Sequence, residues 1–122
     1  MAMRVLIADD NEFIRRAIGA LLSKDEVFEV CGEAADGRDA LEKADALKPD
    51  VVLLDISMPG MDGLSLAHTL SQEIPAPKIL IISHHDAEQL LPRSLHAGAH
   101  GCVDKARMVT DLLPMLKRVL SQ

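Results

Sequence analysis

The sequence predicts an α/β fold in which a parallel sheet of five strands carries helices on both faces. Short apolar runs alternate along the chain with stretches whose apolar residues recur at helical spacing, and this alternation is typical of strands joined by right-handed helical crossovers. Two runs, Val51–Leu54 and Ile79–Ile82, are apolar throughout, as central strands covered on both faces should be. The 122 residues, 48% of them hydrophobic and 2% aromatic, suffice for one domain with an aliphatic core.

Each predicted strand is a short apolar run bounded by polar residues or a turn. In chain order, the strands are Val5–Ala8, Val30–Ala34, Val51–Leu54, Ile79–Ile82 and Gly101–Val103. Each predicted helix follows one of these strands and has an apolar stripe that would face the sheet. In chain order, the stripes lie within residues 13–22, 40–47, 64–70, 90–95 and 112–120. Neither a repeat nor a linker interrupts the pattern, so residues 1–122 are predicted to form one domain.

Two prolines fall within the last two helical stretches. Pro92 would remove a backbone hydrogen bond to the Glu88 carbonyl and crowd that carbonyl, so we expect the helix around it to be short, kinked or late in starting. If Asp111 is the N-cap of the last helix, Pro114 falls in the first turn, where a missing N–H costs little.

The chain is acidic, with a net charge of −6. This charge argues against nucleic-acid binding through this domain, because phosphate contacts need clustered Lys and Arg. The N-terminus lacks the long apolar stretch of a signal peptide, and no apolar run approaches the ~20 residues that a membrane span needs. Cys31 and Cys102 are too few for a disulfide framework. We therefore expect a cytoplasmic protein without membrane contact.

Residues with useful chemistry follow four of the predicted strands. Asp9 and Asp10 follow the first strand, Asp55 the third, and Ser83 the fourth, while Lys105 comes just beyond the fifth. In open α/β sheets, ligands bind outside the carboxyl ends of the strands. These five residues are therefore predicted to share one edge of the sheet.

Crowded carboxylates either raise their pKa values or bind a cation, and Mg²⁺ suits hard oxygen ligands that leave room for water and phosphate. A Mg²⁺ ion beside Asp55 would orient a phosphoryl group for in-line attack by the carboxylate, which would become an aspartyl phosphate. Lys105 would offer the same group a positive charge, and Ser83 a hydroxyl. Asp55 is therefore the candidate acceptor, with Asp9 and Asp10 as candidate metal ligands.

Taken together, these residues resemble the marks of bacterial response-regulator receiver domains over essentially the whole chain. The acidic pair Asp9–Asp10, the acceptor Asp55, the hydroxyl of Ser83 and the ammonium of Lys105 match the family in order, and "DISMPGMDG" matches its acceptor loop. The stretches "VCGEAADGRDALEKA" and "HAGAHGCVDK" are similar to the NarL/FixJ (LuxR-type) subfamily. Its members usually join a receiver to a helix-turn-helix DNA-binding domain.

The resemblance implies a flavodoxin-like (βα)₅ fold with strand order 2-1-3-4-5. It also implies a switch of a two-component system, in which a sensor histidine kinase phosphorylates Asp55, with Mg²⁺ as cofactor and the Ser57 backbone carbonyl as a further metal ligand. Such a domain is not an enzyme for an external substrate, since it catalyses only its own phosphoryl transfer and dephosphorylation. The expected output is transcriptional, through a helix-turn-helix domain beyond this sequence, and phosphorylation is expected to favour a homodimer.

Two positions depart from the family pattern. Cys102 stands where receivers usually carry Tyr or Phe, three residues before the Lys, and Ala106 stands where Pro often follows it. The aromatic ring normally reorients when the strand-4 hydroxyl turns toward the phosphoryl group, and a thiol is too small to fill the vacated space. We expect phosphorylation to be retained, with weaker coupling from Ser83 to the last strand.

Three other interpretations fit part of the pattern. Asp9 or Asp10 could simply cap the first helix. A phosphatase of the haloacid-dehalogenase type also uses an Asp nucleophile and Mg²⁺, but it requires D-x-D after the first strand, where this chain has Asn11 in place of the second Asp and no cap insertion. A receiver-like interaction module that needs no phosphate is kept open by Cys102, and labelling with acetyl phosphate separates it from the switch.

Overall fold

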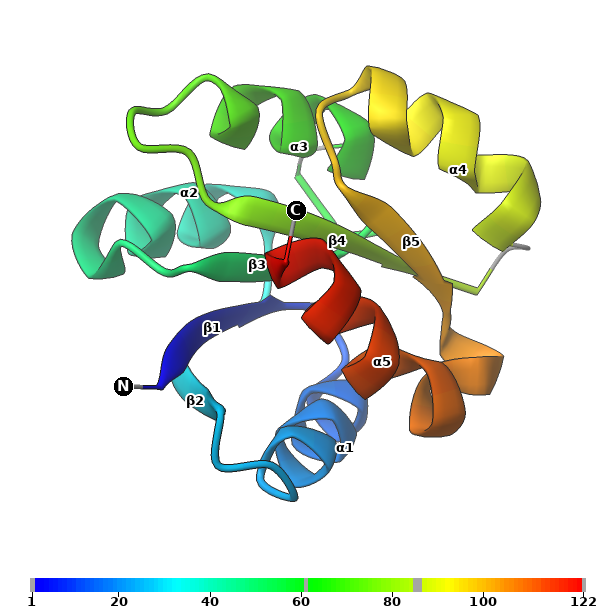
Figure 1. Cartoon of the computed structure of the whole chain (residues 1–122). Helices are drawn as coiled ribbons and strands as arrows, with labels where there is room; N and C mark the ends of the chain where they lie inside the picture. Colours follow the sequence, from blue (N-terminus) through cyan, green and yellow to red (C-terminus); the bar gives the residue numbers. More distant parts are fainter. Residues whose placement is uncertain (1, 61, 85–86, 122) are drawn as a thin grey trace.

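The sheet has five parallel strands in the order β2-β1-β3-β4-β5, which confirms the predicted α/β fold and the implied strand order (Figure 1). The computed structural model describes residues 2–60, 62–84 and 87–121. The strands are β1 (Met3–Ala8), β2 (Phe28–Ala34), β3 (Val51–Asp55), β4 (Lys78–Ser83) and β5 (Gly101–Asp104). The helices are α1 (Glu12–Leu22), α2 (Gly37–Leu47), α3 (Gly63–Ser71), α4 (Ala87–His96) and α5 (Met108–Leu120).

Helices cover both faces of the sheet. Helices α1 and α5 lie on one face, and α2, α3 and α4 lie on the other (Figure 1). Because side chains alternate along a strand, Val5 and Ile7 of β1 enter the core beneath α1 and α5, whereas Leu6 and Ala8 enter the core beneath α2 to α4. Strand β3 is buried at every residue, as its unbroken apolar run predicted. Among the described residues, no helix is both long and apolar enough to cross a membrane.

Strands β1 and β2 pair through a bulge. Val5 pairs with Val30, but Leu6 pairs with Gly32, so Cys31 is an extra residue in β2. Since the side-chain period of a strand is two, one extra residue exchanges the faces of every side chain that follows it. The part of β2 after Cys31 therefore presents the opposite face from the one that an unbroken ladder would give.

The N-termini of three helices are capped by short polar side chains. The Asn11 side chain accepts hydrogen bonds from two backbone N–H groups at the start of α1, and the Asp36 and Asp62 side chains each accept one at the start of α2 and α3. The interpretation of Asp9 or Asp10 as the cap of the first helix is therefore wrong, because Asn11 is the residue directly before α1 and already fills that role. Both acids remain available for the site.

Helix α4 is continuous through Pro92. It includes every residue from Ala87 to His96, so a late start is wrong, whereas a kink at Pro92 stays a prediction. Pro92 cannot donate to the Glu88 carbonyl, but both residues lie on the exposed side of the helix. On the opposite side, Leu90 and Ser94 are buried against the sheet, and the Ser94 hydroxyl donates to the Leu90 carbonyl at 3.0 Å. Packing of this face offsets the loss of one backbone bond.

Helix α5 begins earlier than its apolar stripe suggested. It starts at Met108, directly after a 3₁₀ turn at Lys105–Arg107. Asp111 lies in the first turn and is not the N-cap, so the assumption that placed Pro114 in that turn is wrong. Met108 is buried in the core beneath α1 and α5, which accounts for the earlier start. Pro114 lies within the helix on its exposed side.

Candidate functional site

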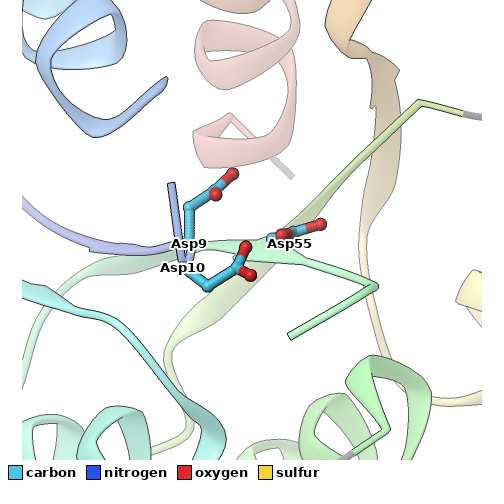
Figure 2. A group of neighbouring side chains, drawn as sticks. All are labelled: Asp9, Asp10 and Asp55. Atoms are coloured by element: carbon cyan, nitrogen blue, oxygen red, sulfur yellow. The ribbon is translucent and has the colours of Figure 1, made fainter. Parts of the chain in front are cut away.

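Three carboxylates meet at the carboxyl-terminal edge of the sheet. Asp9 and Asp10 follow β1, and Asp55 is the last residue of β3, the strand that pairs with β1. One oxygen from each side chain lies within 4.8 Å of the other two (Figure 2). The structure thus brings together the three acids that the sequence predicted to share this edge.

Lys105, the residue directly after β5, reaches this cluster with its ammonium group. Its Nζ atom lies 2.8 Å from Asp9 Oδ2 and 3.4 Å from Asp55 Oδ1. Its side chain is only 5% exposed, and burial of an ammonium group is tolerated when negative charge compensates it. The predicted convergence of Lys105 with the acids is therefore confirmed, and the ammonium neutralises part of their charge.

Asp55 lies almost fully buried at the centre of the site. Burial raises the pKa of its carboxyl group above the usual value, and the Asp9 charge acts in the same direction. The backbone N–H of Ser57, which donates to Asp55 Oδ1 at 3.1 Å, and the Lys105 ammonium oppose this rise. Because the net pKa shift is upward, the site gains from further positive charge beside Asp55.

The residues present fit a magnesium ion. Asp9 Oδ2 is buried and, although it contacts the Lys105 ammonium, the geometry gives it no hydrogen bond within the described part of the chain. Asp10 is exposed, so one side of the cluster is open to water. Carboxylate oxygens with space for water are the ligands that Mg²⁺ prefers. The donor set therefore matches a hard divalent cation held by Asp9, Asp10 and Asp55.

The two serines of the predicted site come from the neighbouring strand β4 and from the loop directly after Asp55. Ser83 is fully buried at the end of β4, the strand in which the preceding Ile82 pairs with Asp55. Ser57 is exposed in the loop after β3, and its backbone N–H holds Asp55. These positions are compatible with the expected roles of the Ser83 hydroxyl and the Ser57 carbonyl, which remain predictions.

Cys102 lies in β5, at the opposite edge of the sheet from Cys31, and both cysteines are free thiols. A groove of about 580 Å³ lies along α4, β5 and α5, and Cys102 is one of its lining residues. Burial raises the pKa of the Cys102 thiol to about 11, although a hydrogen bond with Ser94 partly opposes this. The thiol is therefore neutral at physiological pH and acts as a small core side chain.

Sequence reasoning missed two residues that support the site. Asn11 donates its backbone N–H to Asp9 Oδ1 at 2.8 Å while its side chain caps α1. Arg15 donates from its guanidinium to the backbone carbonyl of Asp9 at 2.7 Å. The cap preference of Asn directly before a helical stripe could have indicated Asn11. Nothing in the local sequence distinguishes Arg15 from Arg16, because only the fold shows which of them faces the sheet.

The raised pKa of Asp55 predicts a pH-dependent effect of the Asp55→Asn substitution. A carboxyl whose pKa is higher in the folded state lowers stability once the pH exceeds that pKa, and it has no such effect below its unfolded pKa of about 3.9. Without Mg²⁺, Asp55→Asn should therefore raise the thermal midpoint at pH 7, and the gain should fade as the pH falls toward 4. Thermal unfolding across this pH range measures it. A gain that grows toward acid pH would contradict the direction of the shift.

Comparison with known proteins shows which family and which solved structures this chain is similar to. The family model described as response regulator receiver domain matches residues 5–117. One similar solved structure is the signal receiver domain of the putative response regulator NarL from Mycobacterium tuberculosis. It superposes on this chain with a TM-score of 0.90 and a sequence identity of 34%, and the alignment covers 98% of this chain and 97% of that chain.

Two curated relatives have names that describe different activities. The response regulator protein VraR of Staphylococcus epidermidis is 33% identical over 118 residues, which is 97% of this chain and 56% of that protein. A protein-glutamate methylesterase/protein-glutamine glutaminase of Myxococcus xanthus is 43% identical over 104 residues, which is 84% of this chain and 30% of that protein. The chain thus spans about a third to a half of the length of these relatives.

Proposed function

Because this chain belongs to the response regulator receiver domain family, we propose that it is the switch of a two-component system, phosphorylated on Asp55 by a sensor histidine kinase in the cytoplasm. The observation that carries the proposal is the buried ammonium of Lys105 between the carboxylates of Asp9 and Asp55. Residues 1–122 are proposed to be one receiver domain. Uptake of a phosphoryl group from acetyl phosphate, read by intact mass, tests the proposal.

Asp55 is suited to act as the nucleophile. Its Oδ1 atom is held by the Ser57 N–H and contacts Lys105, so Oδ2 is the oxygen we assign to attack. In the proposed step, a new P–O bond forms at this oxygen while the P–N bond to the kinase histidine breaks, and the histidine side chain leaves as an imidazolate that takes up a proton from water to become neutral imidazole. The held orientation of the carboxylate lowers the entropic cost of this in-line attack.

Lys105 and Ser83 are proposed to stabilise the transferred group. The ammonium that contacts Asp55 Oδ1 at 3.4 Å would remain beside the product and offset its negative charge, and the Ser83 hydroxyl would donate to a phosphoryl oxygen. Asp9, Asp10, Asp55 and the Ser57 carbonyl would hold Mg²⁺. When bound, Mg²⁺ neutralises charge on the phosphoryl oxygens.

For the output, we propose control of transcription, as in the NarL/FixJ subfamily. The similarity to VraR and to the NarL receiver supports this proposal. A second candidate output is an enzymatic one, in which the receiver is linked to a catalytic domain. The 43% identity over 104 residues to the methylesterase relative supports this output as well as the other similarities support transcription. Sequencing the gene beyond the codon for residue 122 distinguishes them: a helix-turn-helix domain would support the first candidate and an esterase domain the second.

Asp10→Ala should weaken Mg²⁺ binding. The substitution removes one carboxylate of the cluster, and loss of a charge contact worth about 1–2 kcal/mol at a partly exposed site corresponds to roughly tenfold in affinity. Titration of Mg²⁺ by amide NMR gives the dissociation constants of both proteins. An unchanged affinity would place the metal elsewhere.

A further inference from the structure

Arg15 of α1 connects the ends of β1 and β2. One terminal nitrogen of its guanidinium donates to the Asp9 carbonyl at 2.7 Å, and its Nε donates to Glu33 Oε1 at 2.9 Å. The Arg15 side chain is only 17% exposed. The next residue, Arg16, is 72% exposed and pairs only with Glu12 of its own helix among the described contacts. The two neighbouring arginines therefore have different structural settings.

The bulge in β2 makes the contact with Arg15 available. After the extra residue Cys31, Ile7 of β1 pairs with Glu33, so the Glu33 side chain lies on the face that α1 covers. Without the bulge, Glu33 would pair with Ala8, whose side chain enters the core beneath α2 to α4. The register shift thus positions a carboxylate where it fixes the Arg15 guanidinium.

Asp9 is constrained on both its backbone and its side chain. Its N–H donates to the Ala34 carbonyl at 3.0 Å, and Asp9 Oδ1 accepts from the Asn11 N–H at 2.8 Å. These bonds leave the Asp9 carbonyl to be fixed by Arg15. This peptide group leads directly into Asp10, so its orientation sets where the second acid of the cluster points.

We propose that Arg15 is a positioning residue for magnesium binding, which holds the Asp9–Asp10 peptide in the orientation that directs both carboxylates at one ion. The inference rests on the proposed function. An arginine is required because its planar fork can donate to the Asp9 carbonyl and to Glu33 at the same time, which a lysine ammonium cannot reproduce. Glu33 also neutralises the Arg15 charge, which would otherwise oppose a cation nearby.

The test compares Arg15→Met, Arg15→Lys and Glu33→Gln with a matched control, Arg16→Met. For each protein, Mg²⁺ affinity is measured by amide NMR titration, thermal stability is measured without metal, and the ¹³C shift of the Asp9 carbonyl is recorded. Arg15→Met should weaken Mg²⁺ binding about tenfold or more, as for other residues that orient metal ligands. Arg16→Met should bind Mg²⁺ as the wild type does. The Asp9 carbonyl shift should move in the Arg15 variants and to a smaller extent in Glu33→Gln, but not in Arg16→Met.

Phosphorylation by acetyl phosphate adds a second measurement. In Arg15→Met, the Mg²⁺ concentration for half-maximal rate should rise, while the rate at saturating Mg²⁺ stays close to wild type, because the role is in binding. Arg15→Lys should also bind Mg²⁺ more weakly despite keeping its charge, and Glu33→Gln should show a smaller loss. If Arg15→Met does not fold, the Mg²⁺ affinity of Arg15→Lys decides the test.

The proposal is overturned if Arg15→Lys or a folded Arg15→Met binds Mg²⁺ within twofold of wild type while Asp10→Ala binds it weakly. A lower thermal midpoint of the Arg15 variants with unchanged Mg²⁺ affinity would also overturn the proposal, because it would show that Arg15 contributes only to packing. If Asp10→Ala also leaves Mg²⁺ binding unchanged, the metal site itself is wrong. The failure of the proposed function is thereby distinguished from the failure of this inference.

Discussion

The Asp55→Ala protein is expected to take up no phosphoryl group from acetyl phosphate and Mg²⁺, whereas the wild-type chain takes up one. The effect should be complete because the substitution removes the nucleophile itself. Asp9 is not expected to replace it, since Asp9 Oδ1 is held by the Asn11 N–H and Oδ2 contacts the Lys105 ammonium. Intact mass before and after incubation reports the uptake, and hydroxylamine should remove the adduct because it cleaves acyl phosphates.

Asp45→Ala is the matched control for this experiment. Asp45 lies in α2, its side chain is 80% exposed, and it pairs with Lys48 away from the site. This variant should be phosphorylated at the wild-type rate. Equal uptake by Asp55→Ala and wild type would refute the acceptor assignment. Absence of uptake by the wild type would favour a receiver-like module that works without phosphate.

Lys105→Met should slow phosphorylation by about 10²–10³-fold, the usual cost of removing one group that stabilises developing charge in a buried site. The substitution keeps an apolar stem of similar length but removes the charge that lies 3.4 Å from Asp55 Oδ1. Mg²⁺ binding should be retained or become tighter, because a competing cation has left the cluster. A large loss of rate without a loss of metal affinity is the pattern that distinguishes Lys105 from Asp10.

Rates of acetyl-phosphate labelling at saturating Mg²⁺ measure this effect, with Lys48→Met as the control. Lys48 is an exposed lysine at the end of α2, so its loss should leave the rate unchanged. A Lys105→Met rate within threefold of wild type, far below the expected loss, would show that the ammonium only balances the acids. A parallel loss of Mg²⁺ affinity would assign Lys105 to holding the site together.

The strands and the acidic edge were predictable because each depends on short stretches of sequence. An apolar run such as Val51–Leu54 can satisfy its backbone only by pairing and its side chains only by burial on both faces. Parallel strands then bring their carboxyl ends to one edge, which places Asp55 beside Asp9. The resemblance to receivers supplied the strand order, which the structure has. It also supplied the chemical roles of the individual site residues, and these roles remain proposals.

The helix boundaries near prolines were less predictable. Local rules assign a cost to Pro92 in any helix, but they cannot weigh that cost against the burial of Leu90 and Ser94 on the other side of α4. The start of α5 at Met108 likewise depends on a core contact beneath α1 and α5. Both errors arose because packing against the sheet outweighed backbone preference.

The alternation of strands and helices follows from the amino-acid sequence alone, and so does the set of residues at the carboxyl-terminal edge of the sheet. The contact of Lys105 with both Asp9 and Asp55, and the bond from Arg15 rather than Arg16 to the Asp9 carbonyl, follow only from the folded arrangement. These two groups of features differ because they depend on interactions of different range along the chain. The periodicity of apolar residues depends only on residues that are close in the sequence. A hydrogen bond or ion pair between distant segments depends on the register of the strands, and the register here includes a one-residue bulge in β2.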